Sequence, residues 1–475
     1  MRCLLVEDEA GRIDAILPEL EKYFGEGNVV VAMDRDSAKE NIDKQPYDLI
    51  VLDQSIPTGA ERLNPNVMHG RSVLSYVLEV APDTPVYFLT GLPMEDEYID
   101  SLIAEGKKCD VWGDRKPISL ILRFQKSSPQ LLLDAVSKLT ETARTTHEIE
   151  INTKGKNIQL SDEEKRLMRS FSRLQNGVCV DIELLGDGLS GALVLKADVK
   201  DKRGAVRISA ASKIGKHKTI SDEIGRYERE LVRLRPGTHA PIVAGAIARV
   251  ATSMGAFYRL LDGYEFSLFK VLERSDKDAA TCVSTVRQNQ NPWTESSTVA
   301  RMRVDDLVKL VIWEENLPKI HALIDDLNWQ AFENREISVN MCTRHGDLHG
   351  ENVLINSDLA AMMIDYGAVG AFPSAFDAIT LELSPFFHPH GLRGKLNWTP
   401  EFGAIDWYDR EAFCEITTMP NYIAACRDWA HHDGFGDREV LACAYAYVLR
   451  QLQFPTTDKD LARAIISGIL VRNIS

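Results

Sequence analysis

The chain has 475 residues, a formal net charge of −15 and a pI of about 5.3. Single hydrophobic cores stop growing at roughly 250–300 residues, so this length indicates two or more domains, and the acidic surface argues against nucleic acid as a bulk partner. The sequence contains no run near the ~18 apolar residues of a membrane helix, no signal-peptide core and no Cys-x-x-Cys pair. We therefore expect a cytoplasmic protein with no membrane or nucleic-acid partner.

The first 125 residues alternate short apolar strands with helices. Strands are predicted at Cys3–Val6, Asn28–Met33, Leu49–Leu52, Val86–Leu89 and Asp110–Trp112, and helices at Ala10–Phe24, Asp36–Gln45, Arg71–Val80 and Glu95–Glu105. Apolar strands that alternate with helices are typical of a parallel sheet covered on both faces. This part of the chain is therefore predicted to be a doubly wound α/β domain.

Polar residues stand where these predicted strands end. Glu7 and Asp8 follow the first strand, Asp53 the third and Thr90 the fourth, while Lys116 follows the fifth. The carboxyl ends of parallel strands meet at one edge of the sheet, so we expect these side chains to lie together. Converging carboxylates repel one another unless a cation lies among them, and Mg²⁺ prefers oxygen ligands of this kind.

This order of residues resembles the response-regulator receiver domain, a flavodoxin-like fold, over about residues 1–125. The resemblance implies a phospho-acceptor at Asp53, Mg²⁺ ligands at Glu7, Asp8 and Asp53, and switch residues at Thr90 and Lys116. It further implies a sensor histidine kinase as phosphoryl donor and is compatible with a homodimer formed through the receiver. The stretch from Thr58 to His69 is longer than is usual in the family, which could alter access to the acceptor or form a partner contact.

Residues 126–175 are predicted to be a helical linker. Leu131–Ala143 has amphipathic spacing and could complete the first domain, and Ser161 with Glu164 forms a capping-box pattern for a further helix. Strands are expected from Val178 onwards. The polar stretch 275–300 is predicted to be a loop or an insertion.

A glycine motif opens the second half of the chain. Gly186, Gly188 and Gly191 fit G-x-G-x-x-G, but strands follow them, whereas a dinucleotide fold requires a helix at that point. A glycine-rich turn between antiparallel strands instead favours a kinase lid over the phosphates of ATP. Residues Tyr258–Leu261 are the expected adenine-binding hinge.

Lys213, in a strand after this motif, is the candidate that reaches the ATP phosphates. Lys196 is its rival. The following helix offers Glu223 or Glu230 as the ion-pair partner of the lysine, and we favour Glu223.

The segment Arg344–Asn352 reads RHGDLHGEN and contains the most specific motif of the chain. Asn352 follows Asp347 by five positions, the spacing of the H-x-D-x-x-x-x-N loop of kinases, in which the aspartate contacts the acceptor hydroxyl and the asparagine binds Mg²⁺. Asp365 ends the next apolar strand, where a second metal-binding acid is expected.

HGDLHGEN resembles the catalytic loop of the aminoglycoside phosphotransferase and choline kinase group, and the resemblance extends over roughly residues 176–475. It implies a two-lobed α+β protein-kinase-like fold, with an N-lobe at 176–262, a C-lobe at 263–475, and ATP and Mg²⁺ as cofactors. The implied roles are catalytic base for Asp347, Mg²⁺ ligands for Asn352 and Asp365, phosphate anchor for Lys213, and orienting hydrogen-bonders for His345 and His349.

The chain has no room for the long activation segment of eukaryotic-type protein kinases, because a helix is expected from Asp377, soon after Asp365. Control of the kinase is therefore expected from the receiver. We predict a two-component signalling protein whose receiver regulates ATP-dependent phosphoryl transfer to a hydroxyl acceptor, and the short segment favours a small molecule. A receiver-linked pseudokinase scaffold and a kinase with a protein substrate are the alternatives.

Overall fold

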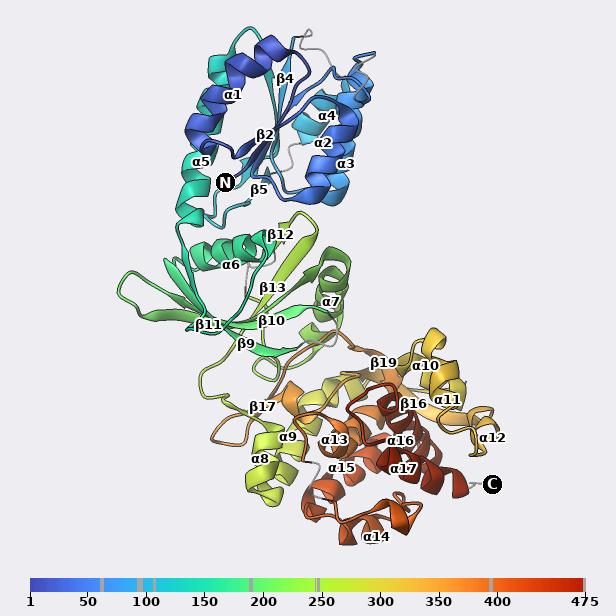
Figure 1. The fold of residues 1–475 in the computed structure, drawn as a ribbon. Helices are drawn as coiled ribbons and strands as arrows, with labels where there is room; N and C mark the ends of the chain where they lie inside the picture. The colour runs from blue at the N-terminus through green and yellow to red at the C-terminus, as the bar shows by residue number, and fades with distance from the viewer. Residues whose placement is uncertain are drawn as a thin grey trace. The chain divides into compact units, whose positions relative to one another are not determined.

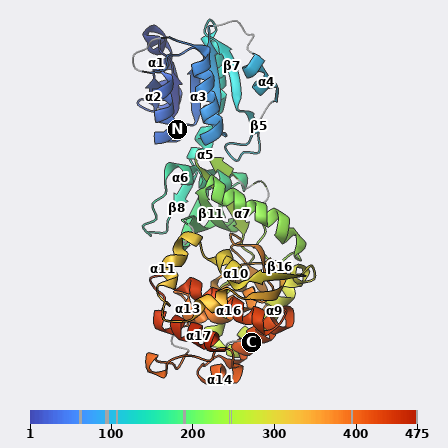
Figure 2. The ribbon, with the colours of Figure 1, turned by 90° about the vertical axis from the view of Figure 1, so that its right-hand side faces the viewer.

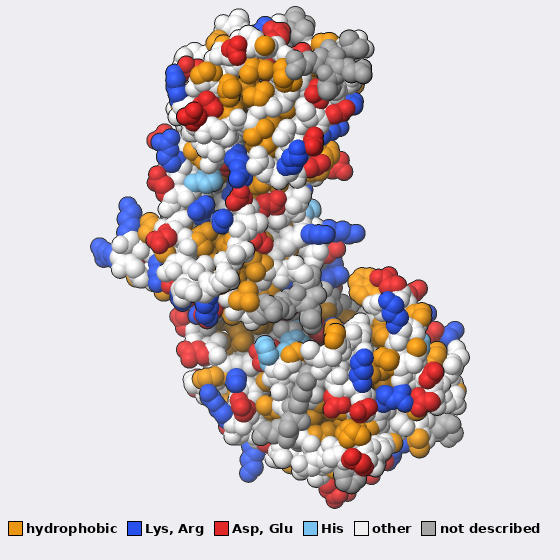
Figure 3. Space-filling model, in the orientation of Figure 1, with side chains coloured by type: hydrophobic (Ala, Val, Ile, Leu, Met, Phe, Trp, Pro, Cys, Tyr) orange, Lys and Arg blue, Asp and Glu red, His pale blue; other side chains and the backbone are white. Residues whose placement is uncertain are grey.

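The computed structural model describes residues 1–59, 64–91, 97–105, 108–187, 191–243, 245, 248–392 and 396–472. The chain divides into two compact units, one of Met1–Ser221 with Ile242–Leu260 and one of Asp222–Pro241 with Leu261–Ser475. Among the helices in these ranges, none is both long and apolar enough to cross a membrane. On the face drawn in Figure 3, Lys and Arg side chains are interspersed with Asp and Glu side chains.

The first unit begins with a parallel sheet. Its strands are β1 (Cys3–Val6), β2 (Val29–Ala32), β3 (Leu49–Asp53), β4 (Val86–Thr90) and β7 (Ile121–Gln125), in the order β2-β1-β3-β4-β7. Its helices are α1 (Ala10–Phe24), α2 (Arg35–Lys44), α3 (Val67–Val80), α4 (Glu97–Glu105) and α5 (Pro129–His147). As Figure 1 shows, α1 and α5 cover one face while α2 and α3 cover the other, and each face has its own apolar core. The predicted doubly wound α/β fold is confirmed.

The predicted fifth strand at Asp110–Trp112 is wrong. β5 (Lys108–Cys109) and β6 (Ile118–Ser119) form a two-stranded pair around this segment, and β7 is the strand that pairs with β4. Val111 and Trp112 are buried from a loop, in the core beneath α5. Their apolar character therefore reflects packing, whereas β7 is a half-buried edge strand with a weaker apolar signal.

The predicted linker of residues 126–175 is divided between two sheets. α5 packs on the first sheet, whereas β8 (Glu150–Asn152) joins the second. The other strands of the second sheet are β9 (Cys179–Asp187), β10 (Leu193–Lys200), β11 (Val206–Lys216), β12 (Ala248–Val250) and β13 (Ser253–Arg259), in the order β12-β13-β11-β10-β9-β8. All neighbours in this sheet are antiparallel except β8 and β9.

α6 (Asp162–Leu174) covers one face of the second sheet and lies beside it in both ribbon views (Figures 1 and 2). Leu167, Met168 and Phe171 enter the core of this sheet, and the Phe171 ring stacks on Phe257 of β13 with centroids 3.9 Å apart. The predicted capping box is present, since the side chain of Ser161 accepts from the backbone of Glu164 and the reverse bond also forms. α7 (His217–Glu230) follows β11.

The second unit is mainly helical, with two small three-stranded sheets, β14-β17-β18 and β15-β16-β19. The strands are β14 (Phe266–Ser267), β15 (Thr298–Arg303), β16 (Glu336–Arg344), β17 (Val353–Ile355), β18 (Ala361–Met363) and β19 (Gly370–Pro373). The α-helices are α8 (Leu268–Arg274), α9 (Asp276–Thr294), α10 (Val304–Val311), α11 (Leu317–His321), α12 (Trp329–Glu333), α13 (Phe376–Phe387), α14 (Arg410–Glu415), α15 (Pro420–Asp433), α16 (Asp437–Gln451) and α17 (Lys459–Val471). The predicted loop at 275–300 is wrong, because α9 and the first half of β15 occupy it.

Candidate functional sites

Three carboxylates meet at the carboxyl edge of the first sheet. Glu7 and Asp8 follow β1 and Asp53 ends β3, and one oxygen from each lies within 4.8 Å of the others. Lys126 joins them, with Nζ at 2.7 Å from Asp53 Oδ2 and 2.8 Å from Glu7 Oε2. Thr90 is buried at the end of β4, at the same edge. The structure therefore brings the three predicted acids together and places the predicted Thr90 at the same edge of the sheet.

The expectation that Lys116 belongs to this cluster is wrong. Lys116 is exposed in the loop between β5 and β6, whereas Lys126 comes directly after β7 and is buried among the acids. The error follows from the misplaced fifth strand, because the residue sought is the lysine after the strand that pairs with β4. A lysine directly after an edge strand is the sequence signal that could have identified Lys126.

The charges of this cluster are not balanced. Burial raises the pKa of Asp53 and of Glu7, and the hydrogen bond and charge of Lys126 offset this only in part. Glu7 Oε2 is buried and has the ion pair with Lys126 but no hydrogen bond of good geometry. Three carboxylates against one ammonium leave excess negative charge on oxygen ligands, so these residues fit a Mg²⁺ ion.

The glycine motif lies in sequence between the end of β9 and the start of β10. Gly186 pairs with Val194, Gly191 has a φ of +70°, which favours glycine, and Gly188 lies outside the described residues. Lys213 of β11 pairs with the same Val194 from the other side. Neighbouring Ile214 packs in the core under α6, so Lys213 lies on the opposite face of the sheet, beside the start of the glycine-rich turn.

The register separates the two candidate lysines. Lys196 pairs with Glu183 and Ala211, farther from the glycine-rich turn than Lys213, and its Nζ lies 3.7 Å from Asp198. Its side chain is partly exposed, whereas Lys213 is buried. The geometry favours Lys213 as the phosphate-binding candidate.

The two candidate glutamates lie in the part of α7 that belongs to the second unit. Glu223 is buried. Glu230 accepts from Thr343 Oγ1 at 2.9 Å and pairs with Arg233 at 3.1 Å, so its carboxylate already has partners within this unit. The assignment of Glu223 to Lys213 stays a prediction.

The predicted catalytic loop follows β16 and is held by its own backbone. The Asp347 carbonyl accepts from Asn352 Nδ2 at 2.9 Å and from the His349 amide at 3.0 Å. The Ile364 amide donates to the Asn352 carbonyl at 3.0 Å, and β17 pairs with β18 directly after it. These contacts bring Asn352 and Asp365 to neighbouring strand ends.

Asn352 and Asp365 fit a hard cation. The amide nitrogen of Asn352 is used by Asp347, which leaves its amide oxygen as the ligand atom, and Asp365 supplies a carboxylate. Asp365 has a φ of 63°, a conformation that non-glycine residues rarely adopt and that is often found at functional sites.

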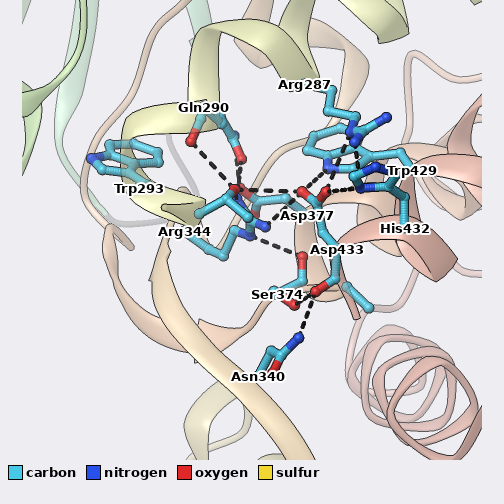
Figure 4. A network of polar contacts seen from close by, with 12 residues as sticks. Arg287, Gln290, Trp293, Asn340, Arg344, Ser374, Asp377, Trp429, His432 and Asp433 are labelled. Atoms are coloured by element: carbon cyan, nitrogen blue, oxygen red, sulfur yellow. Dashed lines mark hydrogen bonds and ion pairs between the residues drawn. The ribbon is translucent and has the colours of Figure 1, made fainter. Parts of the chain in front are cut away.

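A buried polar network that includes Arg344, Asp377 and Asp433 is shown in Figure 4. The carboxylate of Asp377, on α13, accepts from the backbone amides of His345 at 2.8 Å and Gly346 at 3.0 Å. Arg344 is fully buried and pairs with Asp433 at 3.1 Å. Arg344 Nη1 also donates to Gln290 Oε1 of α9 at 3.1 Å. Every one of these charges has a partner, as a buried charge requires, so the loop backbone is fixed from three helices: α9, α13 and α15.

Asp347 itself has a charged partner. Its Oδ1 lies 2.9 Å from Nη1 of Arg450, on α16. Burial alone would raise the pKa of Asp347, but the charges of Arg450 and His349 outweigh burial and hold the pKa at about 2. Arg450 could not be predicted as a partner of Asp347, because 103 positions separate the two residues in sequence.

The two loop histidines are placed differently. Nε2 of His345 lies 2.9 Å from the carbonyl of Ile364, which agrees with an orienting role. Burial lowers the pKa of His349, which favours its neutral form, and its ring lies 4.4 Å from that of His388 between centroids.

No family model and no curated protein matches the chain. A CheY-like receiver domain protein from Methanospirillum hungatei JF-1 is 20% identical, over 30% of this chain and 96% of its own, with a TM-score of 0.22. The receiver domain of Francisella response regulator 1452 is 22% identical, over 30% of this chain and 98% of its own, with a TM-score of 0.21.

A third solved structure matches a larger share of the chain. Aminoglycoside phosphotransferase APH(4)-Ia is 13% identical, over 62% of this chain and 94% of its own, with a TM-score of 0.39. The chain is thus similar to receiver domains over about 30% of its length and to an aminoglycoside phosphotransferase over about 60%.

Proposed function

We propose that this protein is a two-component signalling protein in which phosphorylation of Asp53 controls an ATP-dependent phosphotransferase. The observation that carries the proposal is the loop of Asp347 and Asn352, held beside Asp365 by backbone hydrogen bonds and supported by a fully paired buried network. A purely structural loop has no need of a partly exposed carboxylate at its turn, and Asp347 is about one-third exposed.

Each candidate residue has its own role in the proposed phosphoryl transfer. Lys213 is the proposed ligand of the ATP phosphates, and Asn352 and Asp365 would hold Mg²⁺, which would neutralise phosphate charge. Asp347 accepts a hydrogen bond from the acceptor hydroxyl and orients its oxygen towards the γ-phosphorus. A new bond forms between that oxygen and phosphorus, the bond to the β-γ bridging oxygen breaks, and ADP leaves while the hydroxyl proton passes to Asp347 or solvent.

The test is ATP turnover by the purified full chain with Mg²⁺. We expect Asp347→Asn and Asp365→Asn each to lower kcat by about 100-fold or more, since the first removes the carboxylate that accepts from the acceptor hydroxyl and the second removes a proposed Mg²⁺ ligand. Asp326→Asn is the matched control, because this acid is exposed and pairs with Arg463 at 2.7 Å. Nucleotide binding without turnover in the wild type would favour the pseudokinase alternative, and turnover only with a polypeptide acceptor would favour a protein kinase.

The proposed control by the receiver is supported by a continuous series of contacts within the first unit, which runs from Lys126 through α5 and α6 to the second sheet. α5 begins at Pro129, three positions after Lys126, and its far end contacts α6, where Arg173 donates to the carbonyl of Thr142. α6 in turn packs on the second sheet through Phe171. Phosphorylation of Asp53 would redirect Lys126 towards the new phosphoryl oxygens, and α5 is the element positioned to pass on that change.

A close backbone contact also joins the β5–β6 loop to α6. Gly113, in the β5–β6 loop, has a φ of +71°, and a Cβ atom there would lie 2.0 Å from the carbonyl oxygen of Ser170 in α6. The Ser170 hydroxyl also donates to the carbonyl of Val111 at 3.4 Å. The receiver-like sheet and the glycine-motif sheet are thus joined through α6 by direct packing as well as by the chain.

The control hypothesis is tested with acetyl phosphate as a small-molecule phosphoryl donor in place of a histidine kinase. We expect the donor to change the ATP turnover of the wild type at least severalfold and to leave Asp53→Ala unchanged. Equal turnover of both proteins, with and without the donor, would contradict control by the receiver but not the phosphotransferase activity.

A further inference from the structure

The carboxylate of Asp347 is engaged by a side chain that the motif does not contain. Arg450 lies in the last turn of α16, where the helix dipole favours a cation. Its Nη1 donates to Asp347 Oδ1 at 2.9 Å, and the two side chains are 21% and 33% exposed. Among the described residues, Arg450 is the one whose side chain forms a hydrogen bond with the side chain of Asp347. The two partly exposed groups therefore face solvent as an ion pair.

The pair changes the charge of the site. A bare aspartate would present a negative charge to the acceptor, whereas Asp347 with Arg450 sums to zero. Glu351, nearby in the loop, accepts from Ser267 Oγ at 2.9 Å, and Asp365 is the proposed metal ligand. The described contacts use one of the five guanidinium N–H donors of Arg450, so its remaining donors favour neutral or anionic oxygen atoms.

We propose that Arg450 is a positioning residue that fixes the carboxylate of Asp347 and cancels its charge, so that the acceptor carries no cation beside its reacting hydroxyl. The proposal rests on the phosphotransferase function proposed above and narrows its substrate class to neutral or anionic hydroxyl compounds. A polycationic acceptor would have to place an ammonium close to the guanidinium, where like charges repel in a partly buried setting.

A purely structural role for Arg450 makes different predictions. α16 is almost entirely buried, and an arginine at its end could serve only to anchor the helix. In that case, loss of the guanidinium would lower the melting temperature and the amount of active protein, but the KM for ATP and the preference among acceptors would be unchanged.

The experiment compares wild type, Arg450→Gln and Arg450→Lys in Mg²⁺-ATP turnover, using the full chain. We expect Arg450→Gln to lower kcat by about 10- to 100-fold with a KM for ATP within about twofold of wild type, because the orientation of one catalytic group is lost. Arg450→Lys or added guanidinium should restore part of kcat. Arg463→Gln is the control, since Arg463 makes an ion pair of similar length with Asp326.

A second readout addresses the acceptor charge. Glucose, glucosamine and glucuronate share one ring and differ in charge, and each is added as a probe acceptor. We expect glucosamine to stimulate wild-type ATP turnover least, and we expect Arg450→Gln to narrow this difference. Equal effects of the three compounds on the wild type, including no effect of any, would overturn the acceptor assignment.

The possible failures can be told apart. An active wild type with Arg450→Gln unchanged or faster overturns the positioning role, and a faster variant identifies Arg450 as an inhibitor of the site. An inactive wild type overturns the phosphotransferase function and this inference together.

Discussion

The position of a single lysine determines the chemistry at the first site. Lys126 and Lys116 both follow apolar segments, and both precede a proline within three positions. Only Lys126 extends a strand that pairs with β4, and therefore only Lys126 reaches the edge where Asp53 lies. The acids could be predicted because each directly follows a fully buried strand, whereas the lysine could not, because its strand is half-exposed.

The difference between the two lysines predicts how two single substitutions will compare. Lys126→Ala should reduce phosphoryl incorporation at Asp53 from acetyl phosphate, because a charge-assisted hydrogen bond worth about 1.5–3 kcal/mol is lost, which corresponds to roughly tenfold or more. Lys116→Ala, an exposed site, should behave as wild type. Phosphoprotein measured on a phosphate-affinity gel gives the comparison, and a reversed result would contradict the assignment of Lys126.

At the scale of the element, α6 shows what a helical pattern does and does not reveal. Its start is encoded locally by the capping box. Its central Arg166 is buried, lies 4.1 Å from the ring centroid of Trp112 and pairs with Asp48 at 3.2 Å. An arginine in a polar-looking helix reads as a surface residue, so this contact with the first sheet could not be predicted.

The pair at Asp48 predicts a pH dependence of stability. Burial would raise the pKa of Asp48, but His147 and Arg166 outweigh it and lower the pKa to about 2. A folded-state pKa below the unfolded value stabilises the fold above about pH 4, and this contribution is lost as the pH falls from about 4 towards 2. Its size is on the order of 2 kcal/mol.

Urea unfolding between pH 3 and pH 6 measures this effect. Asp48→Asn should be less stable than wild type at pH 6 by about 2 kcal/mol or more, and the difference should shrink at pH 3. Asp162→Asn, which breaks an exposed pair with Arg2, should cost under about 1 kcal/mol. A constant difference between Asp48→Asn and wild type across this range would mean that Asp48 does not titrate as described.

α9 is the element that sequence reasoning missed. Its buried residues Ala279, Cys282, Val286 and Trp293 follow helical spacing, and Ser275 caps its start by accepting from the Asp278 amide at 3.2 Å. Small and polar side chains around this stripe dilute the apolar signal. Packing against α15 buries one face of α9, although the local sequence pattern does not mark that face as apolar.

At the scale of the whole molecule, contiguous motifs could be predicted and distant partners could not. The loop from Asp347 to Asn352 and the acid cluster are encoded in short segments whose order fixes their geometry. Asp433, which neutralises Arg344, lies 89 positions away in sequence. Neither Asp433 nor Arg450 belongs to a recognisable motif, because each needs only a suitable charge at a position set by helix packing.

The contact at Gly113 has a consequence for how such proteins can be recombined. Since a side chain there would overlap the backbone of Ser170, the β5–β6 loop is shaped for this particular α6. A chimera that received a different first sheet without this loop would lose this packing contact with the helix. The exchangeable module therefore extends through α6 and is larger than the first sheet with its helices.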